Sequence, residues 1–339
     1  MKIGIHPTKD SFSDRWIAYC ENNHIEWKPV DCYRSDIIQE LDDCDALMWH
    51  FSQNSPAAVL FARQLIYSVE ACGKKVFPDF NSVWHFDDKV GQKYLLEALS
   101  APLAPTWIFY NKKDALEWAE QTEYPKVFKL RGGAGSQNVR LVRDRRNAER
   151  LIRKAFNCGF PAYDPYGSLK ERWRMYRLGK TNKMDLVEGL ARFLISPPYS
   201  RIRGKERGYI YFQEFISGND HDIRVIVIGK KAFAIKRMVR KNDFRASGSG
   251  NILYQKDQID EATIKLAFGL SDRLKAQCVA FDFVYKDAEP LLVEINYGFA
   301  PAGYDPCPGY WDNNLKWHEG GFNPYGWIVE DLVSGIMQK

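Results

Sequence analysis

The chain has 339 residues, of which 45% are hydrophobic and 27% charged, and its formal net charge is +5 at pH 7. This length is about right for two or three domains, and the composition is typical of a globular protein and excludes a disordered chain. No run approaches the roughly 18 apolar residues that a membrane span requires. The positive charge is uneven, with eleven Lys and Arg against four Asp and Glu between Lys170 and Arg207, and therefore does not indicate a nucleic-acid-binding protein.

The first 86 residues alternate short apolar strands with helices. Strands are expected over Lys2–His6, Ile25–Val30, Ala46–His50 and Val76–Phe80, and helices over Ser13–Asn22, Ser35–Leu41 and Pro56–Cys72. Such alternation predicts a parallel sheet that is covered by helices on both faces. The Gly-x-Gly-x-x-Gly loop is absent after the first strand, so the pattern does not predict a dinucleotide site.

From Asp87 onward the pattern changes to an α+β body. Residues about 157–208, which carry the charge excess, fit no simple alternation of strands and helices. The expected elements are helices over Asp87–Leu99, Arg146–Phe156 and Gly326–Met337, and strands over Val127–Leu130, Val139–Val142, Tyr209–Ile216, Ile223–Ile228, Ala232–Arg237, Val279–Tyr285 and Leu291–Asn296. The last five strands are expected to be antiparallel, with hairpin turns near 229–231 and 286–290.

The last hairpin is expected to hold two carboxylates opposite each other. Asp282 and Glu294 lie six residues on either side of a turn centred near Ala288, so in that register their Cβ atoms are about 5 Å apart. The alternation of strand side chains puts Asn296 on the same face as Glu294. Two carboxylates among apolar neighbours repel, and a hard cation such as Mg²⁺ removes the conflict. The alternative is an accidental pair on a solvent-exposed hairpin.

Three further motifs are compatible with a nucleotide site. A strand ends at Lys129 and runs into the small-residue turn 132–136, whose backbone N–H groups can approach an anion while the lysine supplies a positive charge. Asp88-Lys89 opens a helix, and the strand 211–216 can offer backbone groups to an adenine ring. Each motif also has an ordinary alternative: a glycine-rich hairpin, a solvated helix start and a plain amphipathic strand.

In their order along the chain, which is the Asp-Lys helix, the strand with Lys129 and its glycine turn, the strand 211–216 and the carboxylate hairpin, the four motifs resemble the ATP-grasp signature. The resemblance is in particular to the ribosomal-protein glutamate ligases, and more distantly to glutathione synthetase and D-alanine–D-alanine ligase. The resemblance covers about Asp87–Val142 and Tyr209–Asn296. The stretch that is most similar to those glutamate ligases consists of Glu214-Phe215-Ile216, Asp222-Ile223-Arg224 and Asp243-Phe244-Arg245. It implies an ATP-grasp fold of the α/β and α+β classes in three parts. These are an N-terminal Rossmann-like (pre-ATP-grasp) domain over 1–86, a lid domain over 87–208 with the basic insertion at about 157–208, and a C-terminal antiparallel-sheet domain over 209–339.

The resemblance also implies ATP and Mg²⁺, with two metal ions, and a role for each matching residue. Lys89 and Lys129 would contact the ATP phosphates, Asp222 would reach the ribose, and Glu214 and Ile216 would bind adenine through their backbones. The expected catalytic residues are Arg237 and Arg245, and the expected metal ligands are Asp282, Glu294 and Asn296. The expected ATP-binding set is Lys89, Lys129, Gly135, Ser136, Gln213, Glu214, Phe215, Ile216 and Asp222.

The implied activity is that of an ATP-dependent ligase, which joins a carboxylate to an amine through an acyl phosphate and releases ADP and phosphate. The alternatives are an ATP-grasp kinase that phosphorylates a hydroxyl, and a non-catalytic ATP-binding protein. The basic insertion favours an anionic substrate, namely an acidic amino acid, a uronic acid, or a nucleotide- or pyrophosphate-linked sugar. Its aromatic residues Trp173, Tyr176 and Tyr199 favour a glycan, as in cell-surface polysaccharide assembly. The alternative for the insertion is a solvated decoration.

Two remaining features concern the surroundings of the site. The aromatic segment that follows Asn296 can wall the acceptor site or form a packed wrap before the last helix. The seven scattered cysteines, without a Cys-x-x-Cys pair, argue against disulfides and zinc and favour the cytoplasm. No nucleic-acid or membrane partner is expected, and a homodimer is compatible with the sequence.

Overall fold

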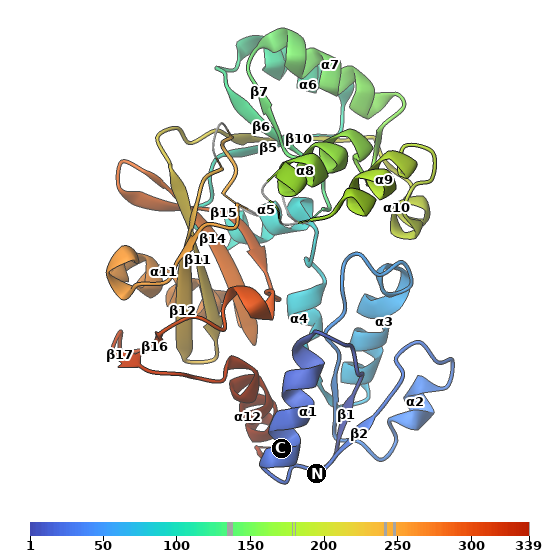
Figure 1. Cartoon of the computed structure of the whole chain (residues 1–339), viewed down its shortest axis with the longest axis vertical. Coiled ribbons are helices and arrows are strands. Elements are labelled where there is room, and N and C mark those ends of the chain that lie inside the picture. Colours follow the sequence, from blue (N-terminus) through green and yellow to red (C-terminus); the bar gives the residue numbers. More distant parts are fainter. Residues whose placement is uncertain (134–137, 178, 180, 241–242, 247–248, 339) are drawn as a thin grey trace.

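The computed structural model describes residues 1–133, 138–177, 179, 181–240, 243–246 and 249–338. Figure 1 shows the N-terminal strands and helices at one end, a long antiparallel sheet in the middle and a smaller sheet with its helices at the other end. Among the described helices, none is long and apolar enough to cross a membrane. All seven cysteines are free thiols.

The N-terminal sheet is parallel, as predicted, with the order β2-β1-β3-β4. Its strands are β1 (Ile3–Ile5), β2 (Trp27–Pro29), β3 (Ala46–Met48) and β4 (Lys75–Phe77). Helix α1 (Phe12–Asn22) covers one face, and α2 (Ile37–Glu40) and α3 (Ala58–Ala71) cover the other. Successive strand side chains point to opposite faces, so Met48 packs in the α1 core and Leu47 in the α3 core.

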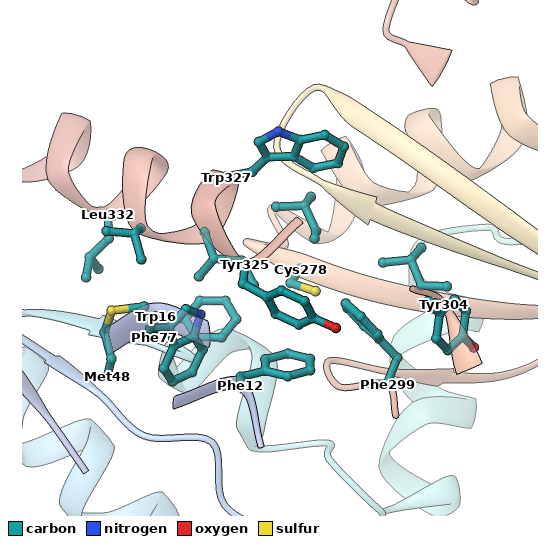
Figure 2. Packing of buried hydrophobic residues seen from close by; sticks show 14 of the residues in the cluster. Phe12, Trp16, Met48, Phe77, Cys278, Phe299, Tyr304, Tyr325, Trp327 and Leu332 are labelled. Atoms are coloured by element: carbon teal, nitrogen blue, oxygen red, sulfur yellow. The ribbon is translucent and has the colours of Figure 1, made fainter. Parts of the chain in front are cut away.

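The last helix, α12 (Pro324–Met337), returns to this N-terminal sheet and packs beside α1. Figure 2 shows the aromatic core that results. The ring of Phe299, which follows the central sheet, lies 4.7 Å from Phe12 and 5.5 Å from Phe233. Rings at such distances make favourable tilted and edge-on contacts, so this core joins the N-terminal sheet to the central sheet.

The smaller sheet is antiparallel and has the order β5-β10-β6-β7. Its elements are β5 (Thr106–Phe109), α6 (Lys112–Gln121), β6 (Lys126–Lys129), β7 (Arg140–Val142), α7 (Arg145–Phe156) and β10 (Ile210–Glu214). Helix α7 buries Ala148, Leu151, Ile152 and Ala155, which recur at the spacing of one helical face. Two short helices, α4 (Phe80–Val83) and α5 (Lys89–Ala98), connect the first sheet to this one.

The pairing of β10 bears on the expected domain boundaries. Residues Ile210–Gln213 pair with β5 and Tyr211–Glu214 with β6, so the strand expected to open the third part lies in the sheet of the second. Because α12 also returns to the N-terminal sheet, a simple division at 209 does not describe the packing. We propose that the second part extends to Glu214.

Among the residues that the structure describes, the basic insertion contains three helices, where the sequence predicted no regular pattern. They are α8 (Pro165–Arg177), α9 (Lys183–Ala191) and α10 (Pro198–Arg203). The short strands β8 (Phe160–Pro161) and β9 (Lys205–Glu206) pair with each other and bring the two ends of the insertion together. The insertion is therefore a helical unit that leaves and rejoins the smaller sheet at one place.

The central sheet follows the path β15-β14-β11-β12-β16-β17, with β13 paired to β12. Its elements are β11 (His221–Ile228), β12 (Lys231–Met238), β13 (Ile252–Leu253), α11 (Glu261–Leu274), β14 (Cys278–Lys286), β15 (Glu289–Asn296), β16 (Gly309–Asp312) and β17 (Trp317–Glu319), together with the 3-10 turns η1 (Lys256–Gln258) and η2 (Pro301–Gly303). Helix α11 covers one face, and the aromatic core of Figure 2 covers the other. Strand β16 pairs with β12, so most of the aromatic C-terminal segment is a packed wrap.

Candidate active site

A pocket of about 450 Å³ collects the residues singled out in the sequence. Its lining comes from α5, from strands β6, β10, β11, β12, β14 and β15, and from the segments that follow β3, β6, β10, β12 and β15. It contains every expected site residue that the structure describes, namely Lys89, Lys129, Gln213, Glu214, Phe215, Ile216, Asp222, Arg237, Arg245, Asp282, Glu294 and Asn296. Gly135 and Ser136, expected on the phosphates, lie outside the described residues.

The carboxylate pair on the last hairpin has the predicted register. Asp282 on β14 is the Cα partner of Glu294 on β15. The turn residues are Asp287 and Ala288, with φ of 52° and 68°, and this turn by itself would pair Asp282 with Val293. A bulge at Val293 adds one residue to β15 and restores the pair, so the prediction is correct through a feature that it did not contain.

Two arginines hold the carboxylate of Asp282. Arg224 Nη2 donates to Oδ2 at 2.7 Å, and Arg237 Nη2 lies 2.9 Å from Oδ1. Burial alone would disfavour the charged form of Asp282, but the two guanidinium groups outweigh it and hold its pKa at about 2. Asp282 is therefore a buried carboxylate that is already ionised in the free protein.

Glu294 and Asn296 present the other two oxygen donors. Glu294 Oε1 lies 3.0 Å from Lys89 Nζ, and the side chain of Lys89 is only 4% exposed. Burial disfavours the ammonium form of Lys89, but its attraction to Glu294 and Asp87 raises its pKa. Among the described residues, the Oδ1 atom of Asn296 is a buried acceptor without a hydrogen-bond partner. Asp282, Glu294 and Asn296 all line the same pocket, and their carboxylate and amide oxygens are of the kind that Mg²⁺ prefers as ligands.

Lys129 is oriented by a neighbouring amide. Its Nζ donates to Gln213 Oε1 at 2.7 Å, and Gln213 Nε2 donates to Thr106 Oγ1 at 3.1 Å. Burial lowers the pKa of Lys129 to about 8, with Lys89 adding repulsion and Glu294 partly opposing it. Gln213, which was expected to bind ATP, therefore orients the lysine beside the pocket through its side chain.

The other end of the pocket contains the strand expected to bind adenine. Glu214 turns its carboxylate toward buried Lys126, with Oε2 and Nζ 2.6 Å apart, while Phe215 packs edge-on against Phe244 at 5.9 Å. Both carboxylate oxygens of Asp222 accept hydrogen bonds from Arg237, at 2.6 and 2.7 Å. The contact of Asp222 with a ribose stays a prediction. A ribose hydroxyl would have to share the Asp222 carboxylate with Arg237.

The glycine turn and the Asp-Lys helix form one unit with the basic insertion. Gly133 N–H donates to Asp87 Oδ1 at 2.6 Å, and Lys89 Nζ donates to Gly133 O at 3.0 Å. Arg203 of α10 lies 2.7 Å from Asp87 Oδ2, and a Cβ atom at Gly132 would overlap its guanidinium group. The insertion therefore reaches the edge of the pocket through one buried ion pair.

The remaining catalytic expectation, Arg245, lies on the loop after β12. Arg245 Nη2 is 2.6 Å from Asp243 Oδ2, and both residues precede the segment that leads to β13. On the same loop Arg240 Nη1 donates to Glu171 Oε2 of α8 at 2.9 Å. The loop that brings Arg245 to the pocket thus also contacts the insertion.

Sequence reasoning missed several residues of this site. Arg224 is the clearest case, because it lies two residues after Asp222 on one strand and the period of two puts both on the same face. Lys126 and Asp87 were harder to recognise from the sequence. Each forms an ion pair with a residue on a distant element, and the sequence around either residue alone does not indicate that partner. The wall formed by His50, Phe51, Ser52 and Gln53 gave no signal at all.

Comparisons with known proteins identify an ATP-grasp domain in this chain. The model of the RimK-like ATP-grasp domain matches residues 200–303. The alpha-aminoadipate–LysW ligase LysX of Saccharolobus solfataricus is 24% identical over 237 residues, which span 69% of this chain and 70% of that protein.

Two solved structures resemble the whole chain. A RimK domain ATP-grasp protein from Sphaerobacter thermophilus has a TM-score of 0.56 at 15% identity, with 98% of this chain and 100% of that one covered. The D-alanine–D-alanine ligase of Bacillus anthracis, solved with ATP, has a TM-score of 0.55 at 14% identity, with 100% and 97% covered. At these identities the likeness is evidence about the fold alone, and it extends over nearly the whole chain.

Proposed function

From the ATP-grasp fold and the RimK-like ATP-grasp domain of this chain, we propose that it is an ATP-dependent ligase that joins a carboxylate to an amine. The sequence relative is by name a ligase, and so is one of the two structural relatives. The activity releases ADP and phosphate and proceeds through an acyl phosphate.

The observation that carries this proposal is the set of oxygen donors at the end of the last hairpin. Asp282 and Glu294 pair across β14 and β15, and Asn296 adds a buried acceptor without a partner among the described residues. We propose that these three residues hold Mg²⁺, as two ions, which would neutralise the charge of the ATP phosphates.

The proposed roles of the cationic residues follow from their positions around these donors. Lys89 is buried beside the carboxylate of Glu294, and Lys129 is buried beside the backbone of Val293 on the same strand. Both lysines would bind the phosphates of ATP. Arg237 already bridges Asp222 and Asp282, and Arg245 lies across the pocket. Both arginines are suited to stabilise the charge that develops as the γ-phosphoryl group moves.

The proposed reaction has two steps. A substrate carboxylate attacks the γ-phosphorus of ATP, the bond to the β-phosphate oxygen breaks, and ADP leaves. An amine then attacks the acyl carbon, loses a proton, and displaces inorganic phosphate to give the amide. The acyl phosphate must be protected from water between the two steps, and the largely buried charges of this pocket are compatible with that need.

The identity of the substrates is a finer question. Stacking of a glycan on the aromatic segment after Asn296 has little support, because Phe299, Tyr304 and Trp311 are all buried in the core. The role in cell-surface polysaccharide assembly therefore stays a prediction. We keep the cytoplasm as the proposed location, on the ground that all seven cysteines are free.

The experiment that tests the proposal is a screen of carboxylates and amines for stimulated ADP formation in the presence of Mg²⁺. We expect a carboxylate and amine pair to raise ADP release above the rate with ATP alone. If no carboxylate and amine pair raises ADP release, and ATP is only hydrolysed by water, the ligase proposal is wrong.

A further inference from the structure

A second, much smaller cavity lies beside the end of strand β15. Its volume is about 10 Å³, which is close to the space that the centre of one water molecule needs. Asn296, the last residue of β15, lines both this cavity and the candidate active site. The cavity is therefore in contact with a proposed metal ligand from outside the active-site pocket.

Three residues that line this cavity each have a buried polar atom without a hydrogen-bond partner among the described residues. These atoms are Ser82 Oγ on α4, His85 Nδ1 just after α4, and Asn296 Oδ1. Ser82 is 4% exposed and His85 6%, so bulk solvent does not satisfy them. Buried polar atoms without a protein partner are usually satisfied by ordered water, which makes about three hydrogen bonds in such places. The cavity has the size and the polar groups of a site for one water molecule.

A buried glutamine already joins His85 to strand β15. Gln92 Nε2 of α5 donates to His85 O at 3.0 Å, and Gln92 Oε1 accepts from the backbone N–H of Ile295 at 3.3 Å. Gln92 is itself only 3% exposed. The backbone of His85 is thus held against the residue that directly precedes Asn296. The ring of His85 and the amide of Asn296 therefore line the same cavity because of contacts within the chain, before any ligand binds.

The three atoms form a consistent set of partners for one water molecule. Burial lowers the pKa of His85 to about 4, so its ring is neutral at pH 7, with one nitrogen that donates and one that accepts. With the proton on Nε2, His85 Nδ1 is an acceptor, as Asn296 Oδ1 is. Two acceptors cannot bond to each other, but the two O–H groups of a water molecule can donate to both. Ser82 Oγ–H can then donate to the water oxygen.

We propose that one water molecule binds in this cavity and that Ser82 and His85 position the amide of Asn296 through it. The positioning role rests on the proposed function, in which Asn296 is a metal ligand. An amide oxygen has two lone pairs, so it can accept from the water and bind Mg²⁺ as well. Groups that hydrogen-bond to metal ligands fix the orientation of those ligands and raise the affinity for the metal. Ser82 and His85 do not line the active-site pocket, so they act only through Asn296.

The water site is tested by a crystal structure of the unaltered chain without nucleotide or metal, at a resolution that shows ordered water. We expect one water molecule within about 3 Å of Ser82 Oγ, His85 Nδ1 and Asn296 Oδ1. A cavity without a water molecule, or a direct hydrogen bond between His85 and Asn296, would overturn the proposal. This result does not depend on the ligase function, because neither ATP nor metal is present in the crystal.

The positioning role is tested with two variants and a matched control. Ser82→Ala removes one hydrogen-bonding oxygen, and His85→Phe keeps a ring of similar size without the acceptor nitrogen. The control is Ser271→Ala, the same change at a serine that is 4% exposed on α11 and does not line the cavity. The probe is Mn²⁺, which prefers the same oxygen ligands as Mg²⁺. Its binding together with AMP-PNP, which is not hydrolysed, is measured by electron paramagnetic resonance.

We expect the affinity for Mn²⁺ to fall by about 10-fold in Ser82→Ala and in His85→Phe, and to stay unchanged in Ser271→Ala. A role in packing alone would lower the melting temperature of the variants without changing the Mn²⁺ affinity of the folded protein. Equal Mn²⁺ affinity in the variants, the control and the unaltered chain would therefore overturn the positioning role. Absence of Mn²⁺ binding by the unaltered chain would instead count against the proposed metal site and function.

Discussion

The hairpin β14–β15 and the basic insertion use the same kinds of residue in opposite ways. In the hairpin the paired carboxylates of Asp282 and Glu294 are fully and partly buried, and each has a cation beside it, Arg224 for Asp282 and Lys89 for Glu294. In the insertion both basic and apolar side chains are exposed at the surface. Buried charges must be paired within the folded chain, whereas exposed charges can be paired by another molecule. Changes in the first region should therefore remove chemistry, and changes in the second should alter recognition.

The largest expected effect is at Glu294. Replacement by Gln keeps the size of the side chain but removes one proposed metal-binding charge, so Mg²⁺-dependent ATP turnover should fall by at least about 100-fold, or roughly 3 kcal/mol. Turnover is measured as ADP release at saturating Mg²⁺.

Glu289→Gln is the matched control for this change, because Glu289 is exposed on the same strand. It should turn over like the unaltered chain. If Glu294→Gln does so as well, the hairpin has only a structural role.

A smaller effect is expected at Lys129. Lys129→Ala removes a buried cation next to the proposed phosphate site and leaves Gln213 Oε1 without its donor. ATP affinity should fall by about 2 kcal/mol, or roughly 30-fold, by isothermal calorimetry. An unchanged dissociation constant would remove Lys129 from the nucleotide site.

A change at Arg203 tests the ion pair with Asp87 that joins the insertion to the edge of the pocket. Arg203→Ala leaves the buried carboxylate of Asp87 without this ion pair, so the free energy of unfolding should fall by about 2 kcal/mol in urea titrations. Arg201→Ala, an exposed change on the same helix, should have an effect below about 0.5 kcal/mol. Equal stability of the two variants would show that the insertion is not anchored through Arg203.

A smaller effect is expected for the dependence of ATP affinity on pH. Since the pKa of Lys129 is lowered to about 8, its ammonium form is present below that pH and is lost as the pH rises through it. Affinity for ATP should therefore be roughly 10-fold weaker at pH 9 than at pH 7. Lys129→Arg keeps its charge over this range and should give a flatter profile. An identical decline in both proteins would assign the titration to another group.

Several parts of this structure could be predicted from local sequence. The parallel N-terminal sheet follows from its alternation of strands and helices, and the pair Asp282–Glu294 from its spacing about a turn. That spacing succeeded because the exact position of the turn, at Asp287–Ala288, and the bulge at Val293 compensate each other, and the bulge has no signal in the sequence.

Other parts depend on contacts between distant segments. Arg237 reaches Asp282 only because β11 lies between β12 and β14, and Lys129 is oriented by Gln213 on a strand 84 positions away. The strand Thr106–Phe109 was missed because it directly follows a proline. Helix α9 was missed because its outward face is apolar, which inverts the pattern expected of a surface helix.

The product of the reaction tests the ligase proposal most directly, since a kinase would use the same ATP, Mg²⁺ and hairpin. With ATP, a stimulating carboxylate and hydroxylamine, the enzyme should form an acyl phosphate that hydroxylamine traps, so that one hydroxamate forms for each ADP released. With the true amine, free phosphate and amide should appear in equal amounts. If the γ-phosphate instead remains on the product as a stable ester, the chain is a kinase and the ligase proposal is wrong.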